Sequence, residues 1–77
     1  MLTVKEVEYE GGHTLICLFS NGEKRRIDLT PLCAYPAYEA LRDPKLFAQF
    51  GLDGTIFWTN GADIAPEYLF EHGTPTA

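Results

Sequence analysis

The chain has few of the residues that several large classes of protein require. It contains two cysteines, and six Lys and Arg against eleven Asp and Glu, for a net charge of −5. Two cysteines are too few to staple a small secreted domain, and proteins that coat nucleic acid need clustered basic charge. No stretch approaches the roughly 18 apolar residues of a membrane span, and charges interrupt the start where a secretory signal needs an apolar run. We therefore expect a cytoplasmic protein that does not enter a membrane.

Motifs for catalysis and metal binding are missing as well. The sequence has no phosphate-binding glycine loop, no nucleophile elbow and no paired histidines. His13 and His72 are isolated and are expected at the surface. The carboxylates Asp53, Asp63 and Glu67 are close in sequence, but they flank turns, where acids are usually solvated or cap helices. The sequence predicts no metal site, no cofactor and no catalytic site, and hence no enzyme.

The two cysteines are predicted to be free thiols. Cys17 lies in an apolar strand pattern, where a thiol usually behaves as a small hydrophobic group. Free thiols fit a reducing cytosol, and a disulfide between Cys17 and Cys33 is the alternative interpretation.

Proline is absent from the first thirty residues, and all five prolines follow. Because proline cannot donate a hydrogen bond in a sheet, this predicts a sheet-forming first part and a second part of turns and short helices. In the first strand the alternation slips at Lys5-Glu6, which indicates either a β-bulge or two short strands. Asn21-Gly22 is typical of a two-residue hairpin turn. The result is an antiparallel three-stranded meander with strands over residues 2–9, 14–19 and 23–29.

The second part predicts short helices and a further strand. Asp43-Pro44 is typical of a helix start, with Leu46, Phe47 and Phe50 on one helical face and an end near Gly51. Other helical turns are expected over 36–42 and 66–70, a strand over 55–59 and an extended piece over 62–65. The fold class is therefore α+β, an antiparallel three-stranded meander plus a further strand, with short helices packed on one face. We expect a single domain over residues 1–72 and a frayed tail over 73–77.

The second predicted strand is apolar on both faces. Leu15, Cys17 and Phe19 alternate toward one side, and Ile16 and Leu18 point to the other. A helix on one side and a second subunit on the other would explain this pattern, and so would wrapping by the C-terminal half of the same chain. Ile16 and Leu18 are therefore candidate partner-binding residues, and a homodimer is one of the two explanations.

The only basic run is Lys24-Arg25-Arg26. These three residues are the candidates for a nucleic-acid contact. Strand alternation divides them between two faces, and charge on an outer strand also prevents edge-to-edge aggregation. We favour the role in preventing aggregation.

Trp58, the single tryptophan, precedes an Asn-Gly turn. Core packing is the usual role of such a ring on a strand. A partly exposed tryptophan next to a turn is also a typical interface anchor. Trp58 and Asp63 are therefore further candidates for partner binding, or for a small-molecule site.

The order of four stretches resembles a known bacterial family, the domain of unknown function 2442. The stretches are LICLFSNG (15–22), RIDLTP (26–31), LRDPKLF (41–47) and IFWTNGADIAPEYL (56–69). The resemblance implies a compact α+β fold with no established activity, found beside another small protein in what looks like a toxin–antitoxin pair. Some relatives carry a helix-turn-helix after this module, whereas nothing after Phe70 here would form one.

These observations favour a small protein-interaction module, an antitoxin-like partner of a small basic protein that acts by masking that partner's surface. Its acidic charge would complement a basic partner. The alternatives are a nucleic-acid-binding accessory domain that uses Lys24, Arg25 and Arg26, and a small-molecule-binding domain near Trp58.

Overall fold

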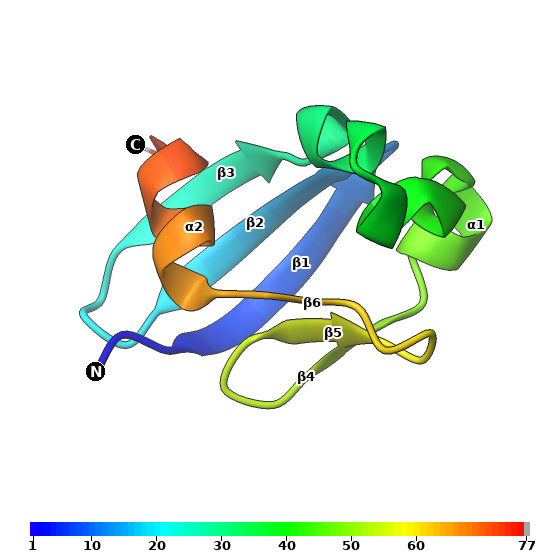
Figure 1. Cartoon of the computed structure of the whole chain (residues 1–77). Coiled ribbons are helices and arrows are strands. Elements are labelled where there is room, and N and C mark those ends of the chain that lie inside the picture. Colours follow the sequence, from blue (N-terminus) through cyan, green and yellow to red (C-terminus); the bar gives the residue numbers. More distant parts are fainter. Residues whose placement is uncertain (77) are drawn as a thin grey trace.

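A computed structural model describes residues 1–76, which form two small antiparallel sheets joined by short helices (Figure 1). The larger sheet has the order β1-β2-β3-β7 and the smaller one the order β4-β5-β6. The strands of the larger sheet are β1 (Val4–Gly11), β2 (Thr14–Phe19), β3 (Lys24–Asp28) and β7 (Thr74–Pro75). Those of the smaller sheet are β4 (Phe50–Leu52), β5 (Ile56–Trp58) and β6 (Asp63–Ile64). The predicted α+β class is confirmed, with two sheets in place of a meander plus one strand.

The first strand is continuous and bulged. Its pairing with β2 shifts register between Val4 and Glu6 and again between Tyr9 and Gly11. The slip in the alternation therefore marks a β-bulge within one strand, which was one of the two predicted alternatives.

The hairpin between β2 and β3 has a three-residue loop. Phe19 donates its N–H to the Glu23 carbonyl at 2.8 Å, and Gly22 donates to Phe19 at 2.9 Å. Gly22 has a φ of +89°, whereas Asn21 has a negative φ, so a two-residue turn with both residues left-handed is not formed. The prediction of a hairpin is correct, but the predicted turn type is wrong. Residues 19–22 form a β-turn, and Gly22 supplies the left-handed position that follows its two central residues.

The second part contains short helical segments. They are the 3-10 helices η1 (Thr30–Ala34) and η2 (Pro36–Arg42), and the α-helices α1 (Pro44–Phe47) and α2 (Pro66–His72). Asp43 caps α1 by accepting a hydrogen bond from the Lys45 N–H, with Pro44 in the first turn, as predicted. The helix ends at Phe47, earlier than expected, and Phe50 belongs to β4. Leu46 is exposed, so Phe47 is the residue of α1 that is buried in the core.

The C-terminal segment is ordered where fraying is expected. Thr74–Pro75 forms β7, which pairs with Arg25 and Arg26 of β3, and Thr76 donates its N–H to the Lys24 carbonyl at 3.1 Å. The reason is the free edge of β3, which offers backbone groups to any extended segment beside it. Ala77, the rest of the predicted tail, lies outside the described residues.

One apolar core joins the two sheets and the helices. Fourteen buried side chains form this cluster, including Leu15, Ile27, Phe47, Ile56 and Leu69, and they come from both sheets and from the helices. In Figure 1, α2 lies across β2 and β3, and the smaller sheet lies next to β1, which contacts β4. Within residues 1–76, no helix is long and apolar enough to cross a membrane.

Candidate interaction surface

The two faces of β2 have different surroundings. Leu15, Cys17 and Phe19 are at most 1% exposed and belong to the core cluster. Ile16 and Leu18 alternate with them and are half-buried on the opposite face, outside that cluster. The sequence prediction of a core face and a second apolar face is therefore confirmed for this strand. We call the second one the open face; it consists of Ile16 and Leu18 with their strand neighbours Glu6, Glu8, Lys24 and Arg26.

The strand register places opposite charges on the two sides of this apolar pair. Leu18 pairs with Glu6 of β1 and with Lys24 of β3. In the next row, Ile16 pairs with Glu8 and with Arg26. Residues that pair directly across a sheet point to the same face, so each apolar side chain lies between an acid and a base.

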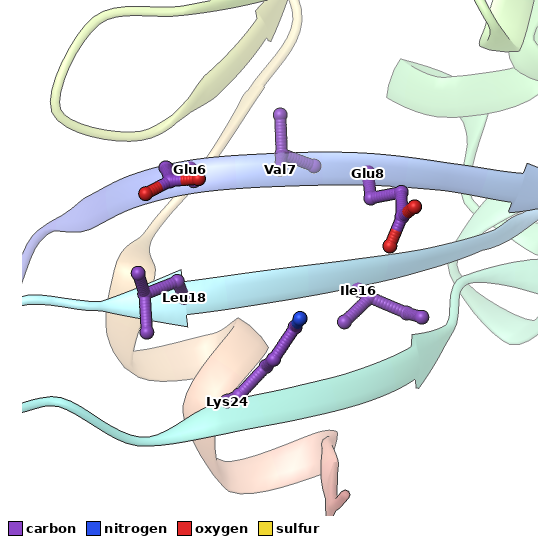
Figure 2. Close-up of a pocket in the computed structure, with 6 residues that line it drawn as sticks. All are labelled: Glu6, Val7, Glu8, Ile16, Leu18 and Lys24. Carbon is purple, nitrogen blue, oxygen red and sulfur yellow. The ribbon is translucent and has the colours of Figure 1, made fainter.

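A shallow groove of about 470 Å³ follows this arrangement (Figure 2). Its lining includes Glu6, Glu8, Ile16, Leu18 and Lys24. In Figure 2 the Lys24 side chain extends from β3 toward β2 and Ile16, and the Glu8 carboxylate turns toward β2 from the other side. The groove thus combines apolar surface with both signs of charge.

Most charges on the open face lack an ion-pair partner. Arg26 forms an ion pair with Glu10 at 3.0 Å, yet its side chain remains 54% exposed. Within residues 1–76, Glu6, Glu8 and Lys24 form no ion pair. The acidic side of the face and the Lys24 ammonium are therefore available to a binding partner.

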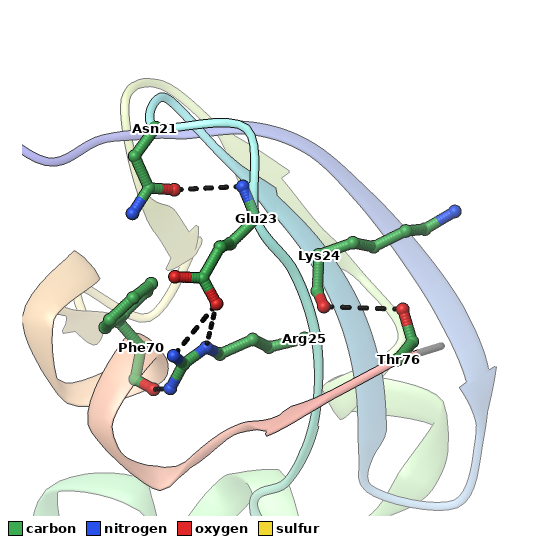
Figure 3. Close-up of polar contacts among 6 residues, drawn as sticks. All are labelled: Asn21, Glu23, Lys24, Arg25, Phe70 and Thr76. Atoms are coloured by element: carbon green, nitrogen blue, oxygen red, sulfur yellow. Dashed lines mark hydrogen bonds and ion pairs between the residues drawn. The ribbon is translucent and has the colours of Figure 1, made fainter.

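Arg25 points to the other face and is used in the fold (Figure 3). Its guanidinium lies 3.6 Å from the centre of the Phe70 ring and donates to the Phe70 carbonyl at 2.6 Å. It also pairs with the Glu23 carboxylate at 2.9 Å, and only 18% of its side chain is exposed. The run Lys24-Arg25-Arg26 is therefore not one basic patch.

Trp58 is a core residue. It is 4% exposed, its Nε1 donates to the Phe47 carbonyl at 2.9 Å, and its ring packs on the Phe47 ring at 5.6 Å between centroids. The hypothesis of a partly exposed anchor is wrong for Trp58, because the indole is enclosed and its donor is satisfied within the fold.

Trp58 and Asp63 do not form a common site. Asp63 is exposed, and its carbonyl accepts a hydrogen bond from the Tyr38 hydroxyl at 2.7 Å. A cavity of about 70 Å³ adjoins Trp58 and is lined on other sides by Leu41, Leu46 and Asn60, without Asp63. Ligand pockets usually measure about 300–1,000 Å³, so this cavity fits no more than a very small molecule.

Both histidines are expected at the surface: His72 is exposed, as predicted, whereas His13 is half-buried. His13 Nε2 lies 2.7 Å from the Leu41 carbonyl, and its ring meets the Phe47 ring edge-on at 4.9 Å. His72 remains exposed and stacks on the Tyr68 ring at 4.0 Å. Within residues 1–76, no three His, Cys, Asp or Glu side chains come together as a metal site would require.

Both cysteines are free and buried. Burial in the apolar core raises the pKa of the Cys17 thiol to about 12. Burial also raises the pKa of Cys33, against the opposing effect of the nearby Arg42. Raised pKa values keep both groups as neutral thiols at physiological pH, which is the opposite of an activated cysteine.

These features define a small α+β domain with a closed core and one charged-apolar sheet face. A family model described as protein of unknown function (DUF2442) matches residues 4–75, so the chain belongs to this family. The resemblance of the four sequence stretches to that family is thereby confirmed. No curated protein matches the chain, and no solved structure matches it either.

Proposed function

We propose that the chain is a protein-interaction module and that the open face of the larger sheet is its binding surface. The observation that carries the proposal is the apolar pair Ile16 and Leu18, which the chain's own core does not cover. Aliphatic side chains surrounded by charged residues are typical of interfaces, where an apolar centre is enclosed by a polar rim. The groove along this pair gives a partner side chain a place to lie.

Net charge favours a basic partner as one version of this proposal. The chain carries −5, and Glu6 and Glu8 present free carboxylates beside the apolar pair. An acidic module that covers the surface of a small basic protein would act as an antitoxin does toward its toxin. Complementary charge would speed the encounter of the two proteins. The buried free thiols support a reducing compartment, so we place this action in the cytoplasm.

Nucleic-acid binding has weaker support. Arg25 is held by Phe70 and Glu23, Arg26 is paired with Glu10, and Lys24 shares its face with two free carboxylates on β1. Phosphate binding gains its affinity from uncompensated basic charge. We therefore expect no mobility shift with DNA or RNA even at about 50 mM salt, where such contacts are strong.

The proposal is tested by comparing what three tagged forms of the chain recover in the native host. The forms are the wild type, Leu18→Glu on the open face and Leu52→Glu on β4, where Leu52 is 39% exposed and serves as the control. We expect the wild type and Leu52→Glu to recover a common protein, measured by quantitative mass spectrometry, that Leu18→Glu does not. Equal recovery by all three forms would contradict the proposal.

A further inference from the structure

The charges of the open face are arranged in space so that the same face of a second copy is complementary to them. Across the sheet, the order is acid on β1, apolar on β2 and base on β3, and it repeats in two successive rows. The first row is Glu6, Leu18 and Lys24, and the second is Glu8, Ile16 and Arg26. The charge on this face therefore changes from negative at β1 to positive at β3, and it does so in the same direction in both rows.

A two-fold axis parallel to β2 and above it turns this face onto a second copy with opposite charges in contact. The rotation exchanges the positions of β1 and β3 and leaves β2 over β2 of the second copy. Glu6 then faces Lys24 of the second copy, and Leu18 meets its own counterpart. In the second row Glu8 faces Arg26. Symmetric dimers use the same patch on both subunits, so each charged contact occurs twice.

A two-fold axis perpendicular to the strands gives the opposite result. Such an axis places β1 over β1 and β3 over β3, which brings glutamates near glutamates and bases near bases. Like charges in an interface cost free energy. The charges therefore select the strand-parallel axis, which corresponds to the aligned class of packing between sheets, at a spacing of about 10 Å. Glutamate and lysine side chains reach across such a gap, with the two apolar pairs at its centre.

We propose that the open face binds a second copy of this chain, with the two β2 strands parallel and facing each other. The inference rests on the proposed function and names the partner of the same surface. A uniformly basic partner would satisfy Glu6 and Glu8 but would oppose Lys24 and Arg26, whereas a second copy satisfies both sides. A standard interface uses about 20–30 residues from each partner, and three short strands contribute fewer. We therefore expect a weak dimer with a dissociation constant in the micromolar range.

The first measurement is the mass of the purified chain across about 5–500 µM by sedimentation velocity and light scattering. We expect the mass to rise with concentration from 8.6 kDa toward twice that value. A mass that stays at that of one chain over the whole range overturns the inference.

The arrangement of the dimer is tested with two charge-reversal variants. Each alone is expected to associate weakly with itself, and the two together are expected to associate with each other. Glu6→Lys places a lysine opposite Lys24 of the second copy, and Lys24→Glu places a glutamate opposite Glu6. We expect each variant alone to weaken self-association at least tenfold. Mixed in equal amounts, they form a heterodimer in which both contacts join opposite charges. General attraction does not explain such pairing, because each reversal shifts the net charge of −5 by two units and both variants stay acidic.

Failure of the mixture to associate more tightly than either variant alone overturns the strand-parallel arrangement, and so does unchanged self-association of the single variants. Leu18→Glu is expected to abolish the dimer and the control Leu52→Glu to preserve it. Circular dichroism of each variant checks that the fold is retained. A dimer that survives Leu18→Glu overturns the inference, because it must then use another surface.

The outcomes separate this inference from the proposed function. If the chain is monomeric and Leu18→Glu abolishes recovery of a different protein, the inference is overturned and the proposed function stands. A chain whose self-association and protein recovery are both unaffected by Leu18→Glu overturns both.

Discussion

Both faces of the larger sheet carry apolar side chains on β2, but only one of them is covered by the core of the chain. On the inner face, the neighbours of β2 include Val4, Val7 and Ile27, which continue the apolar surface toward the core. The charged neighbour on this face, Arg25, is covered by the Phe70 ring. On the open face, Ile16 and Leu18 have charged neighbours on both sides. A strand that is apolar on both faces therefore does not by itself indicate burial on both. The adjacent strands decide which face becomes core and which remains available.

The largest expected effect is a difference in the free energy of unfolding between substitutions on the inner face and on the open face. Phe19→Ala removes a ring that is 1% exposed and packs edge-on against Phe70 at 5.2 Å. Phe→Ala in a core costs about 3–5 kcal/mol, a large share of the stability of so small a domain. Urea unfolding at low protein concentration measures this loss, and Leu18→Ala on the open face should cost less than about 1 kcal/mol. Equal losses for the two variants would show that the faces do not differ.

The next effect concerns the inner side of β3, where the C-terminal segment crosses. A Cβ atom at Gly73 would lie 2.8 Å from Cβ of Arg25 and 2.9 Å from the Leu69 carbonyl oxygen. These atoms belong to packed chain segments, so we expect Gly73→Ala to cost about 1–3 kcal/mol through overpacking. The matched control is Gly51→Ala, where the added atom would meet only the exposed Phe57 ring, which is free to turn away. A loss for Gly51→Ala as large as that for Gly73→Ala would contradict this account.

The free energy of unfolding should also depend on pH through Cys17, which lies on the inner face. Its pKa in the folded state is about 12, above the value of about 8.5 for an unfolded thiol. The unfolded chain therefore releases this proton first. The stability contribution is complete below the unfolded pKa and is lost as pH rises through the folded pKa. Between pH 8 and pH 10, we expect the wild type to lose on the order of 1 kcal/mol more than Cys17→Ala, measured by urea unfolding at each pH. Parallel pH profiles would indicate that Cys17 ionises freely in the folded protein.

The smallest effect compares the arginines of the two faces. Arg25→Lys keeps the charge but loses the planar group that stacks on Phe70, so we expect a loss of about 1 kcal/mol. Arg26→Lys changes a side chain that is 54% exposed, and its effect should be close to zero. Thermal unfolding of both variants measures the difference, and a larger loss for Arg26→Lys would reverse the assignment of the two residues to their faces.

The sequence predicted those parts of the fold that depend on local pattern. The alternation in β2 located its core face, and the Asp43-Pro44 pair located the start of α1. The α+β class followed from the uneven distribution of proline. Each of these signals is set by residues within a few positions of one another.

Contacts between distant segments were not predictable in this way. The Arg25–Phe70 contact joins β3 to α2, and β7 exists only because Thr74–Pro75 lies along β3. Neither has a local signature, since Thr74–Pro75 alone looks like a loose end. The positions of Glu6 and Lys24 on opposite sides of Leu18 depend on two strand registers and a bulge, so the separation of acids and bases on the open face became visible only in the structure.

The position of β7 has a consequence for synthesis of the chain. β1, β2 and β3 are synthesised first, and β7, which covers the edge of β3, follows only after the helices and the smaller sheet. Until then, the nascent meander presents β3 as an unpaired edge, which is a template for pairing with other chains. Lys24 and Arg26 are charges on that strand, and such charges oppose edge pairing. We therefore expect these basic residues to oppose pairing with other chains until β7 closes the sheet.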